Sequence, residues 1–154
     1  MYVIDSTSLL LISDHYKGHE PSIAALLDKL LELIKAHKVG FPTAVIRDCR
    51  SFEQSTYLGA WIQAASVYVK PPDVAYTWQE QAIDHCPEVV DYDADTNDHV
   101  DVLAYAYCLQ QDGGLDVTVV TEDRGDLPTR SSLAEACDAS DIPEIDLVEF
   151  LTRI

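Results

Sequence analysis

The chain opens with the segment Tyr2-Val-Ile-Asp5-Ser-Thr-Ser8, in which a short apolar run ends in a carboxylate and three hydroxyl residues follow. A second apolar run covers residues 9–12. A buried strand followed directly by the start of a helix has this pattern. Because open α/β sheets bind their ligands at the carboxyl ends of the strands, we expect Asp5 to lie at that edge of a sheet.

Strands and helices are expected to alternate along the rest of the chain. Apolar residues recur with a helical period over 22–36, and β-branched residues dominate 116–121. The predicted strands are 2–5, 39–41, 116–121 and 142–145. The predicted helices are 22–36, 43–52, 57–67, 73 to about 85, 97 or 98 to about 113, 132–139 and 147–154. This alternation predicts a single α/β domain over residues 1–154, with a mostly parallel sheet and helices on both faces.

The composition also limits which classes of protein this chain can belong to. The chain has 154 residues, of which 47% are hydrophobic, which is enough for one domain with a full core. It has no apolar run of about 18 residues and no leader-like N-terminus, so we expect a cytoplasmic protein without a membrane partner. The four cysteines are far apart in sequence, which predicts reduced, mostly buried thiols.

The net charge is −17 and the isoelectric point is about 4.3. Taken alone, this charge repels nucleic acid. Two considerations weaken this argument against a nucleic-acid partner. A cluster of acids becomes less negative when it binds divalent ions, and the proteins of a halophilic host are acidic throughout.

Acidic residues recur at the predicted ends of strands and starts of helices. They are Asp5, Asp48, Glu53, Asp98, Asp101, Glu122 and Asp123. In a parallel sheet these positions converge on one edge, where several carboxylates would raise one another's pKa and cost stability. A hard divalent cation such as Mg²⁺ or Mn²⁺ resolves that repulsion, because it prefers oxygen ligands.

The order of these motifs resembles a PIN domain, in particular the small proteins of the VapC toxin type. The opening segment resembles the first strand and first acid of the family. The segment Asn97-Asp-His-Val-Asp101-Val-Leu-Ala104-Tyr-Ala106 resembles its acid-bearing helix, and Val119-Val-Thr-Glu-Asp-Arg124 resembles the strand that delivers its last acid. The tail, Ser132-Leu-Ala-Glu-Ala-Cys137 with Leu147-Val-Glu-Phe-Leu151, is also similar. The resemblance covers essentially the whole chain.

The resemblance implies a three-layer α/β/α sandwich and a Mg²⁺- or Mn²⁺-dependent endoribonuclease, the toxin of a toxin–antitoxin pair. Its partners would be an RNA substrate, an antitoxin protein and a second copy of the chain. Asp5, Asp98 and Asp123 match the first, third and fourth acids, with Glu122 competing for the fourth place and Asp101 able to replace or supplement Asp98. Where the family has a glutamate as its second acid, this chain offers the shorter Asp48, or Glu53 a turn later.

The sequence leaves three further assignments open. Arg124 and Arg130 flank the predicted site and could bind RNA phosphates, or could instead pair with neighbouring acids. Ser6 or Thr7 could contact a ligand, although capping the following helix is the expected role. The atypical second acid and the acidic surface also allow a catalytically silent PIN-like module that binds a protein.

Overall fold

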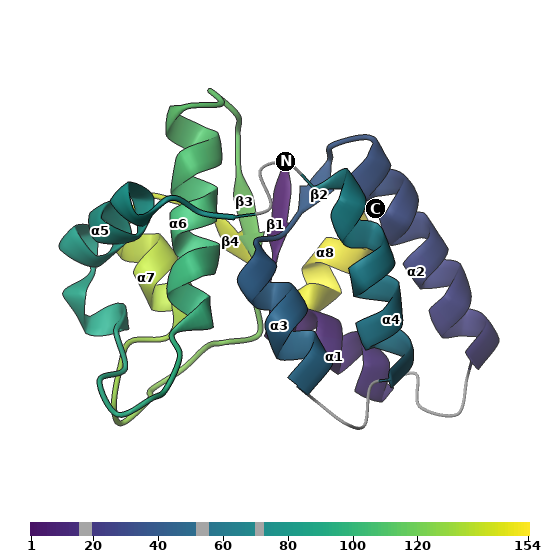
Figure 1. Cartoon of the computed structure of the whole chain (residues 1–154), viewed down its shortest axis with the longest axis horizontal. Coiled ribbons are helices and arrows are strands. Elements are labelled where there is room, and N and C mark those ends of the chain that lie inside the picture. Colours follow the sequence, from purple (N-terminus) through teal and green to yellow (C-terminus); the bar gives the residue numbers. More distant parts are fainter. Residues whose placement is uncertain (16–19, 52–55, 70–72) are drawn as a thin grey trace.

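A computed structural model describes residues 1–15, 20–51, 56–69 and 73–154 of the chain. Within these residues, four strands form one parallel sheet in the order β2-β1-β3-β4 (Figure 1). The strands are β1 (Tyr2–Ile4), β2 (Val39–Gly40), β3 (Thr118–Val120) and β4 (Glu144–Ile145). The predicted strands are therefore all present, and the expected parallel sheet is confirmed.

Helices lie on both sides of the sheet, as the sequence predicts, and complete a three-layer α/β/α arrangement (Figure 1). They are α1 (Ser6–His15), α2 (Glu20–Lys35), α3 (Thr43–Ser51), α4 (Thr56–Ala65), α5 (Tyr76–His85), α6 (Asp98–Gln111), α7 (Leu133–Ala139) and α8 (Leu147–Arg153). Short 3₁₀ turns are η2 (Ser66–Tyr68) and η3 (Pro87–Val89). In the described part of the chain, no helix is both long and apolar enough to cross a membrane.

Helix α6 is the central helix of the fold. It packs against β1, β3, α3, α5 and α7, and its residues from Val102 to Tyr107 are all buried. Ala104 and Ala106, in the middle of this segment, are completely inaccessible to solvent. Burial on every side explains why the apolar residues of α6 do not form a single stripe. Its first turn, which carries Asp98 and Asp101, is thereby fixed relative to the sheet.

Side-chain caps fix the starts of the last two helices. Ser132 caps α7 in a reciprocal arrangement with Glu135, and the carboxylate of Asp146 accepts from the Glu149 N–H at 2.7 Å to cap α8. Phe150 of α8 then packs edge-on against Tyr2 of β1, with ring centroids 5.1 Å apart. The tail of the chain is thus anchored to the first strand.

Strand register brings the carboxyl ends of β1 and β3 together. Ile4 of β1 lies opposite Val120 of β3, and the Asp5 N–H donates to the Val120 carbonyl at 3.1 Å. The residues that follow these strands, Asp5 and Thr121, are therefore neighbours. The four cysteines, all of them within the described residues, form no disulfide, as predicted, and all except the partly exposed Cys108 are buried.

Candidate functional site

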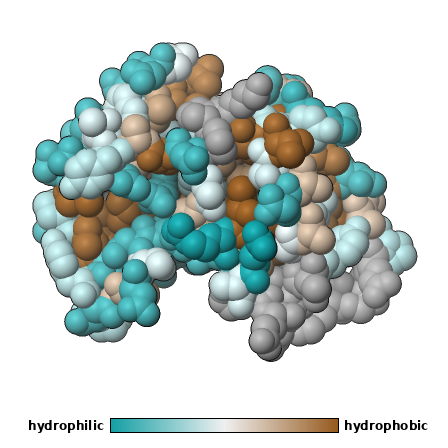
Figure 2. All heavy atoms as spheres, in the orientation of Figure 1, coloured by the Kyte–Doolittle hydropathy of each residue, from teal (hydrophilic) through white to brown (hydrophobic). Residues whose placement is uncertain are grey.

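A small pocket lies where the carboxyl ends of β1 and β3 meet the starts of α1 and α6. It encloses about 150 Å³ and is lined by the carboxylates of Asp5, Asp48, Asp98 and Asp123. Its remaining walls come from Ser6, Thr7, Thr96, His99, Val102 and Arg130. We call it the acid pocket. Figure 2 shows hydrophilic side chains gathered around a hollow at the lower edge of this face of the molecule, the end at which α6 begins in Figure 1.

Asp5 is the most deeply buried of the four acids, with 3% of its surface exposed. Its Oδ2 accepts hydrogen bonds from the hydroxyls of Thr7 and Thr121, both at 2.6 Å, and its Oδ1 accepts from the Ser8 N–H at 2.9 Å. Burial raises the pKa of Asp5 above its ordinary value, and these hydrogen bonds oppose the rise. Asp5 therefore ends the strand and caps α1 at the same time.

The cap of α1 differs from the expectation. The sequence predicts that Ser6 or Thr7 caps the helix, but the bond to the Ser8 N–H comes from Asp5. The two hydroxyls line the acid pocket instead, where Ser6 donates to the Asp48 carboxylate at 2.7 Å and Thr7 donates to Asp5. Asp5 prevails as the cap because it directly precedes the first helical residue, which is the position that reaches the third helical N–H.

Asp48 and Asp98 form the crowded side of the acid pocket. Asp48 is a half-buried residue of α3 and Asp98 is the first residue of α6. Burial and then the hydrogen bond with Asp98 raise the pKa of Asp48 to about 6. Two carboxyl groups in contact cannot both be charged without cost, so they share a proton or attract a cation.

The raised pKa of Asp48 predicts a pH dependence of stability. The folded-state pKa of about 6 exceeds the ordinary 3.8, so the folded protein binds more protons between these values. The Asp48 contribution to the free energy of unfolding should therefore fall as pH rises from about 4 to about 6. Asp48→Asn keeps an acceptor for Ser6 and should remove that contribution, about 1 kcal/mol because solvent screens this half-buried group.

Chemical denaturation of both proteins across this pH range measures the difference, since acids that do not contact Asp48 affect wild type and variant alike. Asp28→Asn is the matched control, because Asp28 is exposed on α2, which contributes no residue to the acid pocket. Parallel stability curves for wild type and Asp48→Asn would contradict the raised pKa.

Asp123 is held at the opposite side of the acid pocket. Its Oδ2 accepts from the Leu133 N–H at the start of α7 at 3.1 Å and pairs with the Arg130 guanidinium at 2.8 Å. Its own N–H donates to the Thr121 hydroxyl at 3.0 Å, which in turn donates to Asp5. Thr121 thus couples the first and last acids of the predicted set.

The two residues beside Asp123 have other contacts. Glu122 does not line the acid pocket, and its Oε1 accepts from the Leu147 N–H at 2.7 Å at the start of α8. Arg124 pairs with both carboxylate oxygens of Glu144, which is the alternative that the sequence left open for this arginine. Of the predicted RNA-binding pair, Arg130 alone lines the acid pocket.

Asp101 lies one helical turn beyond Asp98 and faces an adjoining pocket. That pocket of about 260 Å³ is shared with Asp98, and the Asp101 carboxylate accepts from the Gln79 side chain. Burial raises the pKa of Asp101, which the bond from Gln79 opposes. Glu53, the alternative second acid, lies outside the described residues.

Two residues of this region were not among the predicted site residues. Arg47 forms an ion pair with Asp98 and approaches Asp101 at 3.9 Å. His99 lines the acid pocket, and its Nε2 lies 2.6 Å from the Val89 carbonyl, so this nitrogen carries the proton. Burial lowers the pKa of His99, which favours a neutral ring. No short-range signal could reveal either residue, since each meets its partner through tertiary packing.

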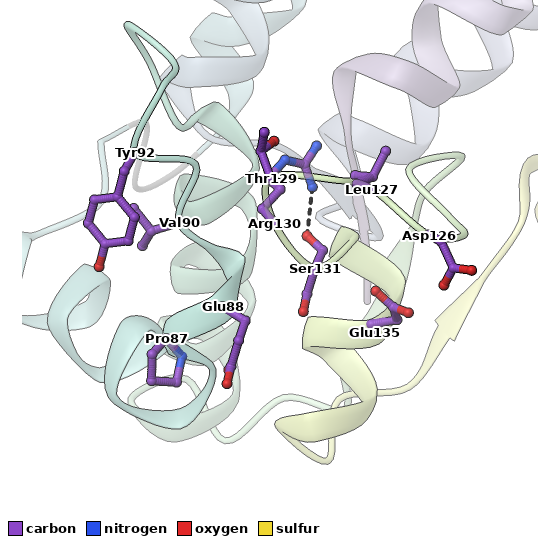
Figure 3. A pocket seen from close by; sticks show the side chains of 10 residues that line it. All are labelled: Pro87, Glu88, Val90, Tyr92, Asp126, Leu127, Thr129, Arg130, Ser131 and Glu135. Atoms are coloured by element: carbon purple, nitrogen blue, oxygen red, sulfur yellow. Dashed lines mark hydrogen bonds between the residues drawn. The ribbon is translucent and has the colours of Figure 1, made fainter.

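A larger pocket adjoins the acid pocket and shares Arg130 with it (Figure 3). It encloses about 460 Å³ between η3 and the loop that leads into α7. Figure 3 shows Tyr92 and Val90 on one side and Asp126 and Glu135 on the other, with Arg130 bonded to the Ser131 carbonyl at 2.8 Å. A ligand that reached from one pocket to the other would pass this guanidinium.

Comparisons of the chain with protein-family models, with curated proteins and with solved structures returned no significant match.

The donor set fits a hard divalent ion in its chemistry, because four carboxylates face one pocket. In the arrangement described for residues 1–15, 20–51, 56–69 and 73–154, no three acid, histidine or cysteine side chains converge on one ion position. Arg47 and Arg130 instead neutralise Asp98 and Asp123. Binding an ion would therefore require the carboxylates to exchange these partners.

Proposed function

We propose that this protein is a Mg²⁺- or Mn²⁺-dependent endoribonuclease of the PIN type. The observation that carries the proposal is the convergence of four carboxylates, from four separate segments, on one pocket at the carboxyl edge of a parallel sheet. Such a pocket concentrates negative charge that a divalent ion compensates. Compensation of that charge would also reduce the repulsion of RNA by a chain with a net charge of −17.

The residues of the acid pocket would have different roles in RNA hydrolysis. Asp5, Asp48, Asp98 and Asp123 would hold the ion. A bound divalent ion supplies charge neutralisation at the scissile phosphate and lowers the pKa of a water molecule. Arg130, between the acid pocket and the larger pocket, offers a guanidinium to a phosphate oxygen. His99 remains neutral and bonded to Val89, so it would not add a second cation.

Cleavage of RNA by the purified protein tests the proposal. We expect end-labelled single-stranded RNA to be cut in Mn²⁺ or Mg²⁺, to be left intact after chelation, and to yield 5′-phosphate and 3′-hydroxyl ends. An antitoxin that binds the protein and a homodimer belong to the same proposal. Absence of cleavage with either ion, at protein concentrations in excess of the RNA, would contradict it.

A catalytically silent protein-binding module is the second candidate. It is favoured by the guanidinium groups that already neutralise Asp98 and Asp123, and by the absence of a three-ligand ion position among the described residues. Thermal unfolding with and without Mn²⁺ separates the two candidates. A ligand that binds only the folded state raises the melting temperature, whereas a silent module without a metal site shows no shift.

A further inference from the structure

Arg47 lies on α3 between two groups of acids. Its guanidinium is paired with Asp98, at the edge of the acid pocket, and lies 3.9 Å from Asp101 one turn further along α6. Its neighbour in sequence, Asp48, is the half-buried acid that contacts Asp98 from within the acid pocket. Asp98 is therefore shared between a cation and an acid that both come from α3.

The two guanidiniums at the acid pocket differ in how firmly they are held. Arg130 is 17% exposed at its side chain and also donates to the Ser131 carbonyl, so the backbone fixes it. The Arg47 side chain is 56% exposed, and its paired groups are the carboxylates of Asp98 and Asp101. Arg47 can thus leave Asp98 without exposing the core.

We propose that Arg47 is the built-in counter-ion of the acid pocket: it neutralises Asp98 in the unloaded protein and competes with a divalent cation for that carboxylate. This inference rests on the proposed metal-dependent function. Because two cations that seek one carboxylate exclude each other, Arg47 lowers the affinity for the divalent ion. It is a positioning residue, and its release from Asp98 accompanies binding of the ion.

The matched pair Arg47→Gln and Arg50→Gln tests the inference. Arg50 is on the same helix and has the same charge, but it donates to the Gln63 side chain at 3.2 Å. Melting temperatures are measured across a Mn²⁺ titration at low ionic strength, and electron paramagnetic resonance measures the free Mn²⁺, from which the bound Mn²⁺ follows by difference. We expect half-saturation of Arg47→Gln at an Mn²⁺ concentration lower by roughly tenfold, the scale of typical coupling between two binding events. Arg50→Gln should match wild type.

If the ion pair of Arg47 served only to hold α3 against α6, the result would differ. The variant would then melt at a lower temperature but would bind Mn²⁺ with unchanged half-saturation, and the inference would be overturned. Arg47→Met removes the charge but retains the aliphatic stem, so it should show the same gain in Mn²⁺ affinity and provides a second measurement if Arg47→Gln does not fold. Absence of Mn²⁺ binding in every variant, wild type included, would contradict the proposed function as well, so the two failures are distinguishable.

Discussion

Asp98→Asn is expected to reduce RNA cleavage by more than about a hundredfold, because residues that only support a metal ligand already cost 10- to 100-fold when they are replaced. Asp98 lines the acid pocket and contacts both Arg47 and Asp48. Asparagine has the same shape and retains an oxygen that can accept from Arg47. The fold should therefore survive while one anionic ligand is lost.

Cleavage under single-turnover conditions in Mn²⁺ measures the loss, and circular dichroism with thermal unfolding verifies the fold. Asp28→Asn removes the same charge from the exposed side of α2 and should cut RNA at the wild-type rate. If Asp98→Asn cuts RNA as fast as this control, the acid pocket is not the catalytic site. Equal loss in both variants would indicate an effect of net charge alone.

The layout of the fold could be predicted because short apolar runs with breakers on each side mark the strands of a parallel sheet. The predicted strand over 116–121 contains β3, and the predicted helix that begins at Asn97 or Asp98 is α6. From these two elements, together with β1, the edge rule for parallel sheets places Asp5, Asp98 and Asp123 near one another, as observed.

The choice among neighbouring acids could not be predicted in the same way. Glu122 and Asp123 follow the same strand, but successive side chains point in different directions. Only the structure shows that Glu122 accepts from the Leu147 N–H at the start of α8 while Asp123 lines the acid pocket. The contact of Arg47 with Asp98 joins residues 51 positions apart. Such a contact depends on the packing of α3 against α6, which no local pattern encodes.

Asp5→Ala is expected to lower the free energy of unfolding by about 3 kcal/mol, since it removes a helix cap worth about 1 kcal/mol and leaves three donors, two of them buried, without their charged acceptor. The orphaned donors are the hydroxyls of Thr7 and Thr121 and the N–H of Ser8. Relief from burying a carboxylate offsets part of the loss, because burial raises the pKa of Asp5. For a chain of this size the melting temperature should fall by about 9 °C.

Asp5→Asn is the informative control for this substitution. Its amide oxygen can still accept from the Ser8 N–H, and its NH₂ group can donate to hydroxyls that rotate to accept, so we expect a loss of about 1 kcal/mol. Guanidinium denaturation of both variants beside wild type gives the two differences, and RNA cleavage should be lost in both. A stability of Asp5→Ala within about 0.5 kcal/mol of wild type, the range of ordinary surface substitutions, would show that Asp5 does not hold β1, α1 and β3 together. Asp5 would then have no structural role, whereas its two buried hydrogen bonds and one part-buried hydrogen bond indicate that the packing of β1, α1 and β3 depends on this carboxylate.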